Sequence, residues 1–290
     1  MSTAADRYGR AACAYLRVLD PPLAPAARRI VALAGADERA RLLDLATGTG
    51  AVARAAHARG ASVVGVDIAP GMITVAHAAS PPAIHFRVAD ASRLPFKDES
   101  FDVVTCGFAL SHMTDRAAVL SQVRRVLRRG GRFVASAWGT HGSNSASAAI
   151  RAELHSRSSA TPALSGPPLP PEPDGAGRAG IVSSSSPPGS SSRFAGILDE
   201  RTWADAERGS RLLAGAGFSI KVVSEPLRGC FADARAALEW TLAWPEASAA
   251  AAALPAAERE QFVRAALAGA AATDLTWTYP VNYFVAERDH

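Results

Sequence analysis

The residues best suited to chemistry are two glycines followed, one strand later, by an acid. Gly48 and Gly50 follow the apolar run 42–45, and Asp67 ends the next apolar run, 62–66. Glycines without a Cβ allow a sharp turn and let a ligand approach the backbone. A carboxylate at the end of the second strand can accept hydrogen bonds from a ribose diol. This arrangement predicts a nucleoside-binding site.

Two nucleoside cofactors fit the pattern. Residues 48–53 match G-x-G-x-x-G/A, the dinucleotide fingerprint, with Asp67 near the expected distance. An S-adenosylmethionine site also combines a strand, a glycine loop and an acid after the second strand. Asp44, just before the loop, favours this second interpretation, because a pyrophosphate at a helix N-terminus prefers positive potential. A sulfonium with a zwitterionic tail tolerates a nearby carboxylate.

Alternating strand and helix patterns must position this turn. Strands are expected at 41–45, 62–67, 84–88, 101–106 and 132–137, and helices at 51–58, 70–79 and 116–128. Uninterrupted apolar strands such as 62–67 are typical of a parallel sheet covered on both faces. The sequence therefore predicts a doubly wound, Rossmann-like α/β fold.

The chain is expected to divide into four regions. Residues 1–40 should form a helical cap, with two helices joined by a proline turn at Asp20-Pro21-Pro22, before the α/β core 41–140. Residues 141–200 hold Ser, Pro and Gly clusters that cannot bury a core, and are expected to be a flexible insert. Residues 201–290 should complete the sheet, with a helix at 201–216, strands at 218–223 and 279–287, and a helical substrate cap at about 231–272.

Composition excludes several functions. Of the 290 residues 48% are hydrophobic and 20% charged, which are globular values, and no run approaches the ~18 apolar residues of a membrane span. Residues 1–10 lack a signal-peptide core, so a cytoplasmic location is expected. The three cysteines and seven histidines show no metal-ligand spacing, so no metal is predicted. The arginines 124, 125, 128 and 129 are expected to form one solvated helix face, and no nucleic-acid partner is predicted.

Four blocks, taken in order, resemble the class I S-adenosylmethionine-dependent methyltransferases, in particular their ubiquinone/menaquinone-biosynthesis-like, small-molecule branch. The blocks are residues 43–50, 65–72, 88–104 and 126–133, and the resemblance is strong over 40–138. Arg128-Arg129 replaces the Lys-Pro that is usual in this family. The resemblance implies a seven-stranded, mostly parallel sheet whose last strand is antiparallel, with S-adenosylmethionine as cofactor.

The same resemblance implies roles for individual residues. Asp67 would bind the cofactor ribose, Asp90 the adenine amino group, and Ala91 would follow along the base, while Met72 would pack on adenine. The cofactor-binding residues predicted in this way are Asp44, Ala46, Thr47, Gly48, Gly50, Asp67, Ile68, Met72, Asp90, Ala91, Ser92, Cys106 and Gly107.

Methyl transfer needs a general base only when the acceptor carries a proton at working pH. His112 follows the fourth strand and His141 the fifth, at the edge where such sheets bind ligands, and both are candidate catalytic bases. Asp115 is expected to cap the helix that begins at Arg116. The aromatic residues expected either to line an apolar substrate pocket or to pack between helices are Tyr8, Tyr15, Phe231, Trp240 and Trp244.

The sequence thus predicts a cytoplasmic S-adenosylmethionine-dependent methyltransferase for a small, hydrophobic metabolite such as a natural product or a quinone-like molecule. Two alternatives keep the fold and the cofactor: an enzyme that catalyses a cyclisation or rearrangement, and a non-catalytic S-adenosylmethionine-binding protein. A homodimer is compatible with the sequence.

Overall fold

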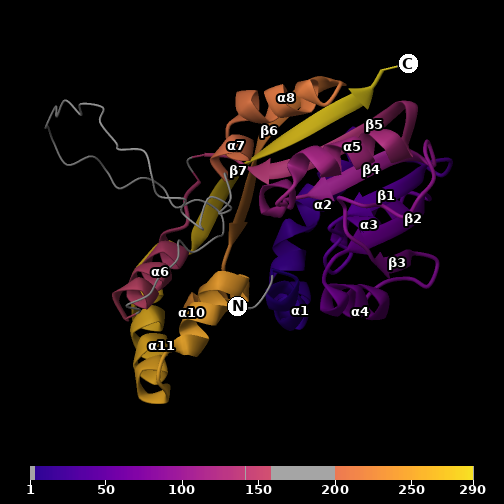
Figure 1. The fold of residues 1–290 in the computed structure, drawn as a ribbon. Coiled ribbons are helices and arrows are strands. Elements are labelled where there is room, and N and C mark those ends of the chain that lie inside the picture. The colour runs from indigo at the N-terminus through magenta and orange to yellow at the C-terminus, as the bar shows by residue number, and fades with distance from the viewer. Residues whose placement is uncertain (1–3, 141, 158–199, 290) are drawn as a thin grey trace, which may run out of the picture.

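The computed structural model describes residues 4–140, 142–157 and 200–289. A seven-stranded sheet runs through it in the order β3-β2-β1-β4-β5-β7-β6 (Figure 1). Its strands are β1 (Arg41–Leu45), β2 (Ser62–Asp67), β3 (His85–Val88), β4 (Phe101–Gly107), β5 (Leu127–Trp138), β6 (Phe218–Cys230) and β7 (Thr276–Arg288). β7 is antiparallel to both its neighbours, and the other pairs are parallel. The predicted doubly wound sheet with an antiparallel last strand is confirmed.

Helices cover both faces of this sheet. Those that alternate with the strands are α3 (Ala51–His57), α4 (Pro70–Ala78) and α5 (Arg116–Val126). Before the sheet come α1 (Ala4–Ala14), the π-helical segment η1 (Tyr15–Leu19) and α2 (Asp20–Ala34); after β4 comes the short 3-10 helix η2 (Leu110–His112). Later helices are α6 (Ser145–Arg157), α7 (Glu200–Ala204), α8 (Ala206–Gly215), α9 (Ala234–Ala243), α10 (Pro245–Ala253) and α11 (Ala256–Ala271). Buried side chains of α2 and α3 join one core cluster, and those of α5 and α8 join another.

The N-terminal region differs from the expected pair of helices joined by a proline turn. Asp20 begins α2, with the prolines in its first turn, and helical structure continues from Ala4 to Ala34. The Asp20 N–H donates to the Tyr15 carbonyl, five residues earlier, which is the π-helical pattern. Pro21 and Pro22 are tolerated because the first turn of a helix does not need their missing N–H groups, whereas Pro25 lies inside α2 and has no N–H to donate to the helical ladder.

The expected flexible insert also differs in part. Residues 145–157 form α6, with Ala146, Ile150 and Leu154 buried at a spacing of four residues. These side chains pack against α9 and α11, and in Figure 1 the helices α6, α10 and α11 lie together beyond one end of the sheet. The remainder of the expected insert, 158–199, lies outside the described residues. None of the described helices is long and apolar enough to cross a membrane.

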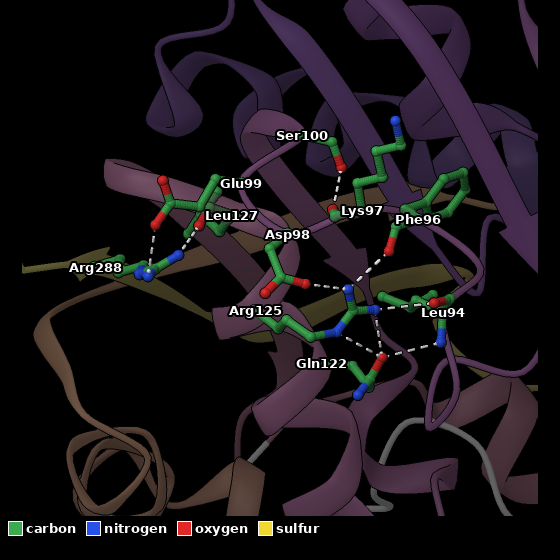
Figure 2. Close-up of polar contacts among 10 residues, drawn as sticks. All are labelled: Leu94, Phe96, Lys97, Asp98, Glu99, Ser100, Gln122, Arg125, Leu127 and Arg288. Carbon is green, nitrogen blue, oxygen red and sulfur yellow. Dashed lines mark hydrogen bonds and ion pairs between the residues drawn. The ribbon is translucent and has the colours of Figure 1, made fainter.

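The predicted single solvated arginine face is wrong. α5 ends at Val126, so Arg128 and Arg129 lie on strand β5. Arg128 pairs with Asp102 at 2.6 Å, while the Arg125 guanidinium points into the loop that precedes β4 (Figure 2). Helix periodicity placed four arginines on one face because the sequence pattern did not show where the helix gives way to the strand.

Arg125 holds the loop 94–98 against α5. Its guanidinium donates to the carbonyls of Leu94 at 2.9 Å and Phe96 at 2.7 Å, and to the Asp98 carboxylate at 2.8 Å (Figure 2). The same group reaches the Gln122 side-chain oxygen at 2.7 Å. One side chain therefore fixes the Leu94-Pro95-Phe96 turn, which lies within the block 88–104 of the family resemblance.

Replacing Arg125 with alanine should lower the free energy of unfolding by about 2 kcal/mol, because hydrogen bonds from a charged donor contribute ~1.5–3 kcal/mol and this site is partly solvated. Urea denaturation would measure the change. Arg129→Ala is the matched control, since the Arg129 guanidinium makes a single exposed contact with Glu99 at 3.9 Å. Equal losses in the two variants would contradict the anchoring role of Arg125.

Candidate cofactor-binding site

The glycine loop lies between β1 and α3, at the edge where the parallel strands end. Ala46, Gly48 and Gly50 have φ of +47°, +55° and +91°, so the backbone passes repeatedly through the left-handed region. Gly48 has no neighbouring atom within 4 Å of where a Cβ would lie, whereas a Cβ on Gly50 would meet the Phe86 ring at 3.0 Å. Gly48 thus leaves open space beside the loop, and Gly50 allows close packing on β3.

Asp67 ties this loop to the end of β2. Its Oδ2 accepts from the Gly48 N–H at 2.9 Å, and its Oδ1 accepts from the Ala69 N–H at 2.9 Å. Burial raises the pKa of Asp67, and these backbone donors oppose that shift. A carboxylate has about four acceptor positions, so each oxygen keeps the capacity for a further hydrogen bond. The geometry leaves Asp67 able to bind a diol while it orders the loop.

Asp44 lies beneath the loop and is only 1% exposed. Its oxygens accept from the Thr47 hydroxyl at 2.6 Å and the Thr105 hydroxyl at 2.7 Å. Burial raises the pKa of Asp44 to about 6, and the charge of Asp67 adds to this increase. The two hydrogen bonds from the threonine hydroxyls act in the opposite direction and lower the pKa. Sequence reasoning missed Thr105, which faces Asp44 only because β1 and β4 pair in this register.

A small cavity of about 60 Å³ opens above Asp44, between the glycine loop and the N-terminal helices. Asp20 and Tyr15 form part of its wall, and sequence reasoning missed Asp20 because it placed that residue in a connecting turn. The Asp20 carboxylate accepts from the Thr49 hydroxyl at 2.8 Å and from Arg54 at 2.6 Å. Asp20 thereby fastens the start of α2 to the glycine loop.

The predicted cofactor residues fall into three groups. Those that line the cavity are Asp44, Ala46, Thr47, Gly48 and Gly107. Those on the more open side, past Asp67, are Ile68, Asp90, Ala91 and Ser92; Ile68 is 54% exposed, and the Asp67 carbonyl accepts from the Ala89 N–H at 3.0 Å. Met72 and Cys106 are buried in packing, Met72 against Ala12 of α1, and Gly50 lies within the turn. The ligand contacts expected of all these residues stay predictions.

His112 lies on η2 with its ring edge-to-face against Tyr8, 5.9 Å between centroids. Burial lowers the pKa of His112. The charge of Arg7 lowers it further and that of Glu246 raises it, and the net lowering favours a neutral imidazole. His141, the other candidate base, lies outside the described residues. Asp115 accepts from the Ala118 N–H at 2.9 Å, which confirms it as the cap of α5.

Aromatic side chains continue from the cavity toward the helices beyond the sheet. Phe108, which borders the cavity, has φ of +56° and stacks on Trp138 with centroids 4.3 Å apart. Trp138 meets Tyr279 at 5.5 Å, and Trp244 meets both Trp138 and Tyr15 at about 6.5 Å. We call these five residues, Tyr15, Phe108, Trp138, Trp244 and Tyr279, the aromatic wall.

Two other predicted pocket aromatics have a different place. Trp240 is 1% exposed and stacks on Trp277 at 5.3 Å, and Phe231 packs against both rings. Of the two expectations for these side chains, the structure shows packing between helices and strands. The surfaces that stay partly exposed in the aromatic wall belong to Tyr15, Phe108 and Trp138.

Two solved bacterial structures share the Rossmann-like fold of this chain. The YcgJ protein from Bacillus subtilis superposes with a TM-score of 0.52 at 15% identity, over 90% of this chain and 96% of that one. A Bacillus halodurans protein whose assignment as a methyltransferase is provisional superposes with a TM-score of 0.53 at 17% identity. The superposition covers 91% of this chain and 99% of that one. At these identities the likeness shows the fold alone.

Sequence comparison is more specific within the core. Residues 43–135 match the family described as "Methyltransferase domain". Demethylmenaquinone methyltransferase from Clavibacter sepedonicus is 44% identical over 96 residues, 32% of this chain and 39% of that protein. The corresponding protein from Thermus thermophilus is 43% identical over 112 residues, which are 37% of this chain and 51% of that protein. The matched region thus spans about half the length, or less, of these curated relatives. Residues 43–135 are thus similar to methyltransferase domains, in particular to those of demethylmenaquinone methyltransferases.

Proposed function

We propose that this protein transfers a methyl group from S-adenosylmethionine to a small, hydrophobic acceptor. The observation that carries the proposal is the set of carboxylates around the glycine loop. Asp44 lies beneath the loop and Asp67 holds it, and no ion pair with a described residue balances either charge, whereas Asp20 on the cavity wall is paired with Arg54. Like charges at short range oppose each other strongly where water is excluded. The site therefore suits a cationic ligand and disfavours the pyrophosphate of a dinucleotide.

The residues fit S-adenosylmethionine in two parts. The cavity lined by Asp44, Tyr15 and the loop backbone would hold the cationic methionine end. Asp67 would accept from the ribose hydroxyls, and Ile68 with Asp90 would bind adenine on the open side. Bound S-adenosylmethionine supplies an activated methyl group, so the protein has mainly to align the acceptor and exclude water.

The aromatic wall supports an apolar acceptor. Phe108 borders the cofactor cavity on one side and stacks on Trp138 on the other, so an acceptor held by this wall would lie next to the methyl donor. Pockets for small organic molecules are mostly apolar with a few polar groups. The neutral His112 is a candidate to remove a proton from a hydroxyl or an acidic carbon. Polyketide, terpenoid and quinone-like molecules share the required chemistry.

We expect the purified protein to bind S-adenosylmethionine in preference to NAD⁺, and to form S-adenosylhomocysteine only when a suitable acceptor is present. A panel of phenolic, quinol and polyketide acceptors, followed by mass spectrometry, would detect an added methyl group. An isomerised acceptor with the cofactor intact would favour the cyclase alternative instead. Binding without turnover across the panel would favour a non-catalytic role, and a preference for NAD⁺ would overturn the cofactor assignment.

A homodimer and a cytoplasmic location remain proposals. Sedimentation of the purified full-length chain would test the first, and cell fractionation the second.

A further inference from the structure

A groove of about 840 Å³ runs between α5 and α8, and it shares no lining residue with the cofactor cavity. It reaches Glu99, just before β4 begins, and Arg288 at the end of the antiparallel β7. The groove therefore extends to the edge of the sheet opposite the glycine loop. Figure 1 shows α8 and α5 on the same side of the molecule.

Two of the five arginines that line this groove are engaged by their own chain. Arg125 anchors the loop 94–98, as described above. Arg288 donates to the Leu127 carbonyl and pairs with Glu99 at 3.0 Å (Figure 2). Asp98 and Glu99, the acids of the lining, are thus already paired, by Arg125 and Arg288 respectively.

The other three arginines keep unused donors. Arg116 makes no hydrogen bond or ion pair with any described residue, although its Nε is buried. Arg124 makes one long hydrogen bond, 3.5 Å from Nε to the Gly217 carbonyl. Arg211 pairs with Glu207 at 3.6 Å, and because both side chains are well exposed this pair holds the guanidinium weakly. The groove therefore carries a surplus of positive charge with donors free for a ligand.

The floor between these arginines is apolar. Leu212 of α8 is 42% exposed, one of three exposed large hydrophobic side chains among the described residues, and Leu120 and Ala216 also line the groove. An apolar floor bordered by free guanidinium groups is complementary to an amphipathic ligand that carries carboxylates next to apolar side chains.

We propose that this groove docks an acidic, amphipathic segment of a partner protein. Arg116 and Arg124 are eight residues apart on α5, or about 12 Å along the helix axis, which is farther than a single phosphate or carboxylate can bridge. The groove has no aromatic side chain on which bases could stack, and its leucines suit apolar side chains better than a sugar-phosphate backbone. An extended or helical peptide with spaced carboxylates can reach both arginines and place apolar side chains on the apolar floor of the groove.

The test uses the full chain and a fluorescein-labelled 14-residue peptide of Glu, Leu and Ala, with leucines three and four positions apart. Fluorescence anisotropy should show binding that weakens as salt is raised, and no comparable binding of the same peptide with Lys in place of Glu. The double variant Arg116→Gln/Arg124→Gln should lower the affinity at least tenfold. The control variant Arg39→Gln/Arg228→Gln changes two exposed arginines outside the groove and removes the same charge. Its affinity for the peptide should stay within twofold of the wild-type value.

A second variant separates docking from folding. Leu212→Ser changes one exposed side chain. It should weaken peptide binding about fivefold and leave the thermal unfolding temperature unchanged. Equal loss in the two arginine pairs, or no preference for the acidic peptide over its lysine counterpart, would overturn the proposal. Tighter binding of a 14-nucleotide single-stranded DNA than of the acidic peptide would also overturn it, in favour of a nucleic-acid surface.

Discussion

Replacing Asp67 with alanine should weaken S-adenosylmethionine binding at least ~100-fold, because two hydrogen bonds from the ribose to a charged acceptor are lost, and each contributes ~1.5–3 kcal/mol. The change also removes the acceptor for the Gly48 and Ala69 N–H groups, so the loop loses its fixed position. Isothermal titration calorimetry with S-adenosylmethionine, and with S-adenosylhomocysteine, would measure the effect.

Two further variants sharpen this test. Asp67→Asn keeps one acceptor oxygen and the shape of the side chain, so it should lose less affinity than Asp67→Ala. Asp37→Ala is the control, because Asp37 is exposed and its carboxylate accepts only from the nearby Arg39 N–H among the described residues. An unchanged affinity in Asp67→Ala, with the unfolding temperature preserved, would refute the ribose assignment.

Cofactor affinity should also fall as pH drops below about 6, by up to tenfold for each pH unit. The pKa of Asp44 is raised to about 6 in the folded protein, so the folded state holds this proton more tightly than the unfolded chain does. The protonated carboxyl therefore favours folding in acid, and this contribution is lost as pH rises from about 4 to about 6. A cationic ligand favours the ionised carboxylate, so binding below pH 6 must expel a proton.

The variant Asp44→Asn isolates this effect. It should bind S-adenosylmethionine more weakly at neutral pH and lose most of the dependence between pH 5 and pH 7. Asp20 and Asp67 lie near the same loop and also have raised pKa values, so a small residual dependence is expected. Calorimetry across this range would measure how cofactor affinity changes with pH in the wild type and in Asp44→Asn. A full wild-type slope in Asp44→Asn would show that a different group accepts the proton.

Much of the sheet was predictable from local sequence. The strands at 41–45 and 62–67 have the predicted bounds, because each apolar run is bordered by residues that end a strand. Asp67 was predictable for the same reason, since its position at the end of β2 follows from the run before it.

The contacts that complete the site were not predictable in the same way. Thr105 reaches Asp44 across 61 residues, and Asp20 reaches Thr49 across 29, so each contact depends on strand register or helix packing. The Asp-Pro-Pro sequence is locally compatible with a turn and with the first turn of a helix. Packing of Asp20 onto Thr49 and Arg54 is what favours the helix here.

The order of the last strands has a consequence for synthesis on the ribosome. β7 occupies the position between β5 and β6, so β6 has no partner in the sheet until the chain has been made as far as Arg288. The neighbouring edge of β5 stays open for the same time. Open strand edges recruit other chains. A nascent chain released before β7 would therefore expose two adjacent unpaired edges at once, whereas the parallel strands from β3 to β5 would already be joined.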